Sequence, residues 1–250
     1  MKIKYAVMSS DDNPTYLDFW PVVSELWSKK FGIIPVLVYF GDKSVDAIRK
    51  IAPDGIVLKQ EAVPNIPLYV QCQWARYYMC CSLDAICILS DIDMLPLSKY
   101  YFVDQIVGIP DDKYVHLNPC IDTYPNIPAC YHVAHSNTFS KVLGNHGDFE
   151  TSMIGVLRDC ASIDSAHGDK KYWFVDEKYS TMKINQYLDK SIFNFIKRDG
   201  GQNGHRIDRP HWQFDLNKVR QDWYYDSHSI RPYSQYKESI DSIKNAALGL

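Results

Sequence analysis

Short apolar runs alternate with amphipathic segments over the first hundred residues. The runs rich in β-branched residues predict strands over 3–8, 34–40, 56–58 and 85–89. Apolar residues at helical spacing predict helices between Pro14 and Gly32, over 45–51 and over 68–83. Strands that alternate with helices in this way form a mainly parallel sheet that helices cover on both faces.

The first helix has clear start and stop signals. Asn13 is a good N-cap and Pro14 a good first helical residue, while Gly32 ends the apolar periodicity. Pro21 lies inside the periodic segment. We expect Pro21 to break or kink the helix, because proline lacks the backbone N–H that a helix interior requires.

The pattern becomes irregular after residue 100. It predicts strands over 114–117 and 129–133, helices over 136–143 and 151–161, and a flexible loop over 199–204. No linker-like stretch divides the chain. We therefore expect one α/β domain over 1–250, with an ordered half over 1–100 and a mixed α+β half over 101–250.

Composition narrows the classes of protein that fit. Apolar residues make up 46% of the 250 residues, charged residues 23%, and the formal net charge is −3. These values exclude a disordered chain and argue against a dedicated nucleic-acid binder, which carries a basic excess. No run approaches 18 apolar residues, and the seven cysteines form no CxxC pair. We expect a soluble, cytoplasmic protein without a membrane span.

Two polar sites follow predicted strands. Asp91-Ile92-Asp93 comes directly after the apolar run 85–89, and a polar stretch over 9–12 follows the first strand. In parallel α/β sheets, ligands bind beyond the carboxyl ends of the strands. Carboxylate oxygens suit Mg²⁺ and Mn²⁺, which need few protein ligands when a diphosphate supplies the rest. The sequence therefore predicts a metal–diphosphate site at Asp91 and Asp93, although an ordinary acidic turn has the same composition.

A family resemblance rests on two segments. They read Gln73-Trp74-Ala75-Arg76-Tyr77-Tyr78 and Ala85-Ile86-Cys87-Ile88-Leu89-Ser90-Asp91-Ile92-Asp93. They resemble the core of GT-A fold (Rossmann-like) glycosyltransferases, in which an arginine-bearing helix precedes the strand that ends in Asp-x-Asp. The chain is similar to the small microbial and large-DNA-virus enzymes and, more loosely, to the glycogenin-like group.

The resemblance implies a reaction and its cofactor. It implies that Mn²⁺ or Mg²⁺ bridges Asp91, Asp93 and the diphosphate of a nucleotide sugar, with UDP as the favoured carrier and GDP as the second. A hexose would move to a hydroxyl of a glycan or a protein-linked acceptor. The half over 1–100 would bind the nucleotide sugar, and the half over 101–250 the acceptor.

The resemblance also implies which residues hold the donor. Arg76 would reach a phosphate or hold Asp91 in place. The nucleotide base would lie on Ser9, Ser10 and Asp11, with the Tyr16 ring stacked on it. A second explanation for the stretch over 9–12 is a capping cluster for the next helix, although Asn13 already serves as a cap.

All eight histidines follow residue 115, and one of them lies in a family-like ending. The segment 225–233 contains His228, Arg231, Pro232 and Tyr233 and resembles a His-x-x-x-Lys-Pro-Trp pattern, with one residue fewer and two replacements. The resemblance makes His228 a third metal ligand and Arg231 a diphosphate ligand. His211, in Arg209-Pro210-His211-Trp212, is the competing metal ligand.

Two acids and several aromatic residues complete the predicted site. By resemblance, Asp176 or Glu177 faces the reacting sugar, as a base in an inverting enzyme or as a stabilising group in a retaining one. The histidine pattern favours retention. The stretch 172–236 holds 14 aromatic residues, whose flat faces suit sugar rings. The predicted acceptor-binding residues are His132, His135, Trp173 and Trp212.

Other functions fit parts of the same pattern. Asp-x-Asp after an apolar strand also opens the site of haloacid-dehalogenase-type phosphatases, in which the first aspartate is the nucleophile. That motif usually follows the first strand, whereas here about 85 residues precede it. A nucleotidyltransferase would need a glycine-rich phosphate loop near the start, which is absent. A non-catalytic sugar-binding module would explain the tyrosines but not the paired carboxylates.

Overall fold

The computed structural model describes residues 1–117, 126–144, 147–163, 166–187, 191–195 and 205–250. The loop predicted over 199–204 lies outside these residues, as does Cys120. Six cysteines are described, and none of them forms a disulfide. None of the described helices combines the length and the apolar character that crossing a membrane requires.

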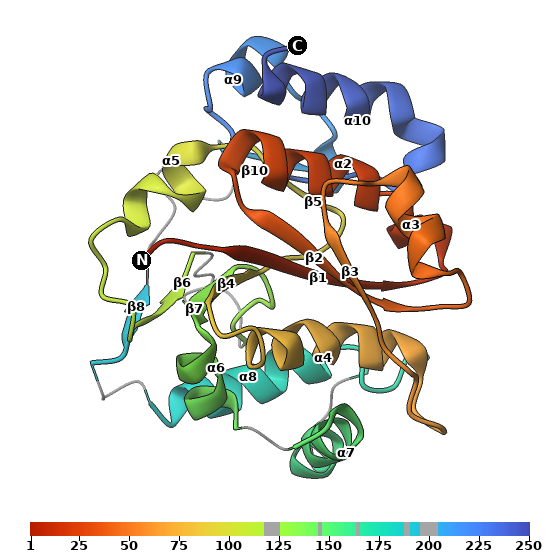
Figure 1. The fold of residues 1–250 in the computed structure, drawn as a ribbon, viewed down its shortest axis with the longest axis vertical. Coiled ribbons are helices and arrows are strands. Elements are labelled where there is room, and N and C mark those ends of the chain that lie inside the picture. Colours follow the sequence, from red (N-terminus) through yellow and green to blue (C-terminus); the bar gives the residue numbers. More distant parts are fainter. Residues whose placement is uncertain (118–125, 145–146, 164–165, 188–190, 196–204) are drawn as a thin grey trace.

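A mixed sheet forms the centre of the molecule (Figure 1). Its strand order is β3-β2-β1-β4-β7-β6-β8. The strands are β1 (Tyr5–Asp11), β2 (Ile34–Phe40), β3 (Ile56–Lys59), β4 (Ile86–Leu89), β6 (Tyr114–His116), β7 (His132–His135) and β8 (Phe193–Phe195). Strand β7 runs antiparallel to both of its neighbours, and the remaining pairs are parallel. The carboxyl ends of β1, β2, β3 and β4 therefore meet at one edge.

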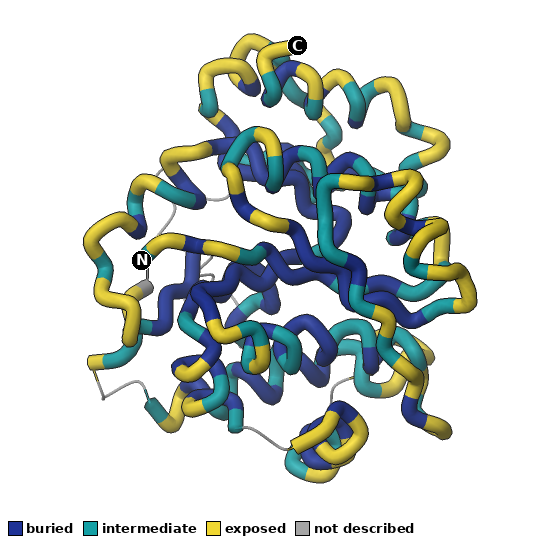
Figure 2. The backbone as a smooth tube through the Cα atoms, viewed as in Figure 1, coloured by how far each residue is buried: buried dark blue, intermediate teal, exposed yellow. Residues whose placement is uncertain are grey.

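Helices cover both faces of this sheet. On one face lie α4 (Leu68–Cys80), α6 (Ser136–Leu143), α7 (Phe149–Asp159) and α8 (Val175–Asn185). On the other face lie α2 (Trp20–Glu25), a π-helical turn over Leu26–Lys30, and α10 (Tyr233–Leu248). Strand β4 shows why both faces are filled: Ile86 and Ile88 pack into one apolar cluster, and Cys87 and Leu89 into the other. Figure 2 shows the central strands buried between these layers.

A second, three-stranded sheet lies beyond the Asp-x-Asp segment. It consists of β5 (Met94–Pro96), β10 (Asp226–His228) and β9 (Arg206–Asp208), in that order. Strand β5 follows directly on Asp93, so this sheet attaches the C-terminal part of the chain to the end of β4. The sequence analysis did not predict it.

The shorter elements complete the chain. They are α1 (Pro14–Leu17), α3 (Val45–Ile51), α5 (Lys99–Phe102), α9 (Leu216–Arg220) and 3₁₀ turns over Asp104–Ile106 and Arg209–His211. The strand over 34–40 and the helices over 45–51 and 136–143 have the predicted bounds.

The other expected boundaries differ from the structure, most of them by one or two residues and four of them more instructively. Strand β1 continues to Asp11, because residues 9–11 pair with the last three residues of β2. The Asn13 side chain caps α1 as predicted, but α1 ends at Leu17, and Pro21 lies in the first turn of α2, where its missing N–H costs nothing. Helix α4 ends at Cys80, and the strand expected over 129–133 begins only at His132.

Replacing Ile88 with alanine should destabilise the protein by about 2–5 kcal/mol, because Ile88 is fully buried and its truncation leaves a cavity between the sheet and α2. The same substitution at Ile51, which is 56% exposed, should change the free energy of unfolding by less than about 0.5 kcal/mol. Urea unfolding of both variants measures the difference. Equal losses would contradict the core assignment.

Candidate active site

A cavity of about 560 Å³ opens at the sheet edge where β1 and β4 end. Residues from β1, α4, the turn after β4, the start of α8 and the chain after β9 and β10 line it. It brings together twelve of the fifteen predicted site residues: Ser9, Ser10, Asp11, Tyr16, Arg76, Asp91, Asp93, Trp173, Asp176, Glu177, His228 and Arg231. The rule that ligands bind beyond the carboxyl ends of parallel strands thus predicted the location.

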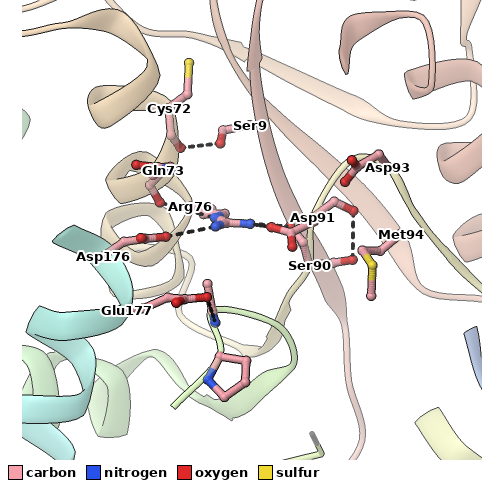
Figure 3. Close-up of polar contacts among 12 residues, drawn as sticks. Ser9, Cys72, Gln73, Arg76, Ser90, Asp91, Asp93, Met94, Asp176 and Glu177 are labelled. Atoms are coloured by element: carbon pink, nitrogen blue, oxygen red, sulfur yellow. Dashed lines mark hydrogen bonds and ion pairs between the residues drawn. The ribbon is translucent and has the colours of Figure 1, made fainter. Parts of the chain in front are cut away.

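The Arg76 guanidinium joins two carboxylates across this cavity. Arg76 projects from α4 and is only 7% exposed. It pairs with Asp91 at the end of β4 and, at 2.9 Å, with Asp176 of α8 (Figure 3). Burial lowers the pKa of the Arg76 guanidinium, but the charge and hydrogen bond of Asp176, together with smaller contributions from Tyr77 and Cys130, outweigh burial and raise it. Arg76 therefore stays charged and fixes the relative positions of α4, β4 and α8.

Glu177 lies beside Asp176 but has a different environment. One carboxylate oxygen accepts a hydrogen bond from the Ala129 backbone N–H at 3.3 Å. Burial and then the negative charge of Asp176 raise the pKa of Glu177 to about 7. Asp176 is 2% exposed and engaged with Arg76, so Glu177 is the better placed of the two acids to exchange a proton near neutral pH.

Asp93 is held by two arginines. Its carboxylate lies 2.8 Å from Arg209 Nη2 and 3.5 Å from Arg231 Nη1. Burial raises the pKa of Asp93, but His228 and the two guanidinium groups outweigh burial and hold the pKa below its usual range. Asp93 is therefore ionised.

His228 has the geometry of an oriented metal ligand. Its Nδ1 lies 3.0 Å from an Asp208 carboxylate oxygen. This hydrogen bond is the largest cause that lowers the pKa of Asp208 to about 2, while burial acts in the opposite direction. A carboxylate on one ring nitrogen orients the other nitrogen, Nε2, for a ligand.

The side chains at this end of the cavity are of the kind that binds a hard divalent cation, but their carboxylates are paired with arginines. Two carboxylates, Asp91 and Asp93, and the His228 imidazole line one cavity. Among the described residues, however, no three His, Cys, Asp or Glu side chains converge as a metal site. Arginines occupy both carboxylates instead. A cation that binds the paired oxygens, Asp91 Oδ1 and Asp93 Oδ2, must therefore open these ion pairs.

Asp12, the residue after the predicted Ser9, Ser10 and Asp11, fixes the end of β1. The Asp12 carboxylate accepts hydrogen bonds from Tyr39, Lys43 and the Asp42 backbone N–H. Burial raises the pKa of Asp12, but these hydrogen bonds outweigh burial and lower it to about 2. Gly41 packs so closely on this cluster that a Cβ there would overlap the Tyr39 hydroxyl. The cluster anchors the β1 end, which leaves Ser9, Ser10 and Asp11 in the cavity wall.

An aromatic wall lies opposite β1. The Trp173 ring is 5.6 Å from the Tyr69 ring, and Lys170 Nζ is 4.4 Å from the Trp173 ring centroid. On the β1 side, the Arg231 guanidinium lies 4.9 Å from the Tyr16 ring centroid. Flat apolar rings with charged groups over them can bind a sugar ring or a nucleobase.

Three predicted acceptor residues lie outside the cavity. His132 is fully buried between Tyr114, whose hydroxyl donates to Nδ1 at 2.8 Å, and the Pro128 carbonyl, 2.8 Å from Nε2. Burial lowers the pKa of His132 well below its usual range, so it is a neutral core residue. His135 pairs with Ile86, at the opposite edge of the sheet.

The third, Trp212, packs against α10 and donates to the Ser239 hydroxyl at 3.2 Å. His211, the competing metal ligand, is exposed and does not line the cavity. These positions support neither an acceptor role for Trp212, His132 and His135 nor a metal role for His211.

Three polar side chains are among the cavity residues that were not predicted from the sequence: Arg209, Gln73 and Lys170. Arg209 lies in the segment that was searched for a histidine ligand, and the 3₁₀ turn over Arg209–His211 directs its side chain to Asp93. Gln73 lies one turn before Arg76 on α4, and its buried Oε1 accepts no hydrogen bond from the described residues. The i, i+3 spacing of Gln73 and Arg76 was the available signal. No sequence signal singles out Lys170.

Solved structures share this fold, whereas no family model and no curated protein matches the sequence. Glycosyltransferase GlyE of Streptococcus pneumoniae TIGR4 matches 100% of this chain at 11% identity, with TM-scores of 0.55 and, for its apo form, 0.56. The chain spans 63% of the length of GlyE. Galactosyltransferase LgtC, solved with donor and acceptor sugar analogs, matches at 13% identity and a TM-score of 0.51, covering 98% of this chain and 96% of LgtC. The predicted GT-A fold is therefore confirmed.

Replacing Arg76 with methionine should destabilise the protein by about 3–5 kcal/mol, because it leaves the Asp91 and Asp176 carboxylates without their counterion. Arg158→Met is the matched control, since the Arg158 side chain is 73% exposed. Adding Asp176→Asn to Arg76→Met should restore part of the loss. Urea unfolding of the four proteins would refute the assignment if Arg76→Met were as stable as Arg158→Met.

The stability of the protein should depend on Glu177 between pH 4.5 and 7. A carboxyl group whose pKa is raised by folding binds more protons in the folded state, so its contribution to stability falls as pH rises through this range. Glu177→Gln keeps an acceptor for Ala129 and removes the titration. The stability of the variant relative to wild type should therefore increase from pH 5 to pH 8, as measured by urea unfolding. A difference that does not change with pH would contradict the raised pKa.

Proposed function

We propose that the protein is a divalent-metal-dependent glycosyltransferase. It moves a hexose from a nucleoside-diphosphate sugar, with UDP favoured over GDP as the carrier, to a hydroxyl of a glycan or a protein-linked acceptor. The observation that carries the proposal is that Asp91, Asp93 and His228 line one cavity together with two acids and three arginines, Arg76, Arg209 and Arg231. The shared fold with GlyE and LgtC supports it, and LgtC was solved with donor and acceptor sugar analogs.

Asp91, Asp93 and His228 would hold the cation. Bound there, Mn²⁺ or Mg²⁺ would act as a Lewis acid that stabilises the charge developing on the leaving diphosphate. Asp208 orients the His228 ring through Nδ1, which leaves Nε2 for the ligand. Arg231 adds a fixed positive charge at the same end of the cavity.

The donor would lie along the cavity from β1 to α8. The end of β1, Ser9–Asp11, and the Tyr16 ring supply polar groups and a stacking face for the nucleoside. Asp176 and Glu177, which also line the cavity, would face the hexose at the other end. Asp176 holds Arg76 in place, and Glu177, when ionised, would stabilise positive charge on the reacting sugar.

The acceptor would enter over the aromatic wall. Trp173 and Glu177 both line the cavity, and Tyr69 and Lys170 lie beside Trp173. A sugar ring stacked on Trp173 would place its hydroxyls near the donor hexose. We propose retention of the anomeric configuration, which rests on the resemblance of the segment 225–233 to retaining enzymes. Proton NMR of the first-formed product distinguishes retention from inversion.

Donor hydrolysis tests the proposed reaction without an acceptor. The protein is incubated with UDP-hexoses or GDP-hexoses and Mn²⁺, and free nucleoside diphosphate is measured. Asp93→Asn should reduce its release about 100-fold or more, because the charge that binds the cation is lost. Asp46→Asn is the matched control, since the Asp46 side chain is 85% exposed on α3.

Other outcomes would point to the competing functions. Release of inorganic phosphate from a simple monoester, lost in Asp91→Asn, would identify a phosphatase. Sugar binding without turnover of any nucleotide sugar would identify a binding module. Turnover that is the same in Asp93→Asn and wild type would refute the role of Asp93.

A further inference from the structure

The three strands of the small sheet bring Asp93, Arg209 and Arg231 to one place. Met94 of β5, His228 of β10 and Asp208 of β9 pair in one row across this sheet. The next residue outward from each strand lies just beyond this row: Asp93, Ser229 and Arg209. The Ser229 backbone N–H donates to the Asp93 carbonyl at 3.0 Å, which extends the alignment by one step. Backbone pairing therefore sets the position of Arg209 beside Asp93, and Arg231 follows two residues after Ser229.

The charges in this cluster do not balance. Two guanidinium groups share one carboxylate, whose side chain is 7% exposed. Arg206 of β9 is engaged with a different carboxylate, Asp226, at 3.3 Å. The cluster therefore carries an excess positive charge that a second anion would relieve.

Arg209 also has an unused donor. Its Nε–H is buried, and within the described part of the chain no group accepts a hydrogen bond from it. A buried donor without a partner costs about 1–3 kcal/mol, so such groups are usually satisfied by a ligand or by water. Guanidinium groups bind phosphate oxygens with two parallel hydrogen bonds. Arg209 thus has both the charge and a free donor for a diphosphate.

We propose that Arg209 and Arg231 form a counterion pair that neutralises Asp93 in the metal-free protein and transfers to the nucleotide diphosphate when Asp93 binds the cation. This inference rests on the proposed function. It explains why the metal-binding carboxylates are engaged with arginines: the arginines stabilise a buried carboxylate until cation and diphosphate arrive together.

The exchange makes cation and nucleotide bind cooperatively. A cation alone that binds Asp93 Oδ2, the oxygen both arginines contact, displaces them and leaves their charges uncompensated. A nucleoside diphosphate alone meets arginines that are still engaged with Asp93. When both bind, the cation replaces the arginines as the partner of Asp93, and the diphosphate replaces Asp93 as the partner of the arginines. Coupling of this kind is reciprocal and typically changes each affinity by about 5- to 150-fold.

Binding titrations test the exchange directly. Electron paramagnetic resonance of free Mn²⁺ gives the metal affinity with and without saturating UDP, and calorimetry gives the UDP affinity with and without Mn²⁺, with GDP measured in parallel. In wild type, each ligand should increase the affinity of the protein for the other by about 5- to 150-fold. In Arg209→Gln, Mn²⁺ alone should bind at least about 5-fold more tightly and UDP alone more weakly, so that the coupling shrinks.

The opposite signs separate this mechanism from structural damage, which would weaken both ligands. Arg220→Gln is the matched control, because Arg220 is exposed on α9 and, among the described residues, its side chain donates to Asn217 in the same helix. Arg209→Lys keeps the charge and should lie between wild type and Arg209→Gln. If Arg209→Gln does not fold, Arg231→Gln should show the same opposite changes.

Three results would overturn the inference. The first is independent binding of Mn²⁺ and UDP or GDP to wild type, and the second is unchanged or weaker Mn²⁺ binding in Arg209→Gln. If metal-dependent donor hydrolysis persisted in either case, the proposed function would stand without the exchange. The third is no binding of Mn²⁺ and of either nucleotide, which would overturn the proposed function as well.

Discussion

The buried guanidinium of Arg76 is the interaction on which the candidate site depends. An arginine that is only 7% exposed must be neutralised, and its two partners come from distant parts of the chain, Asp91 and Asp176. The Trp74 ring packs edge-on against Tyr179, 5.1 Å away, so α4 and α8 are held together by apolar packing as well as by charge. One ion-paired cluster therefore fixes the second half of the cavity relative to the first.

The first half of the fold was predictable because its signals are local. Strand β2 has seven residues and helix α3 begins at a Ser44 cap, so periodicity and caps define both. The convergence of Asp91, Arg76 and the end of β1 followed from the parallel sheet. The strands β5, β9 and β10 have three residues each, too few for any periodicity, and pair only over long sequence distances.

The positions of the predicted site residues that lie outside the cavity could not be predicted for the same reason. His132 and His135 lie near the predicted central strand, but its start and its antiparallel direction decide that one is buried and the other is at the far edge. Arg209 and His211 stand two residues apart, and only the 3₁₀ turn decides which of them faces Asp93. The C-terminal helix had a visible signal, since Ile240, Ile243 and Ala247 recur at helical spacing.

The two ion-paired clusters have opposite charge, and this gives the cavity a polarity. At one end, the carboxyl groups of Asp91, Asp176 and Glu177 lie near a single cation, Arg76. Burial and then the charge of Asp176 raise the pKa of Glu177. At the other end, two arginines share Asp93. A nucleotide sugar matches this polarity, because its diphosphate is negative and its hexose gains positive charge as the bond to the diphosphate breaks. A phosphate monoester reacting at Asp91 would bring its negative charge toward Asp176 and Glu177, where it is repelled. The polarity of the cavity therefore favours glycosyl transfer over phosphate hydrolysis.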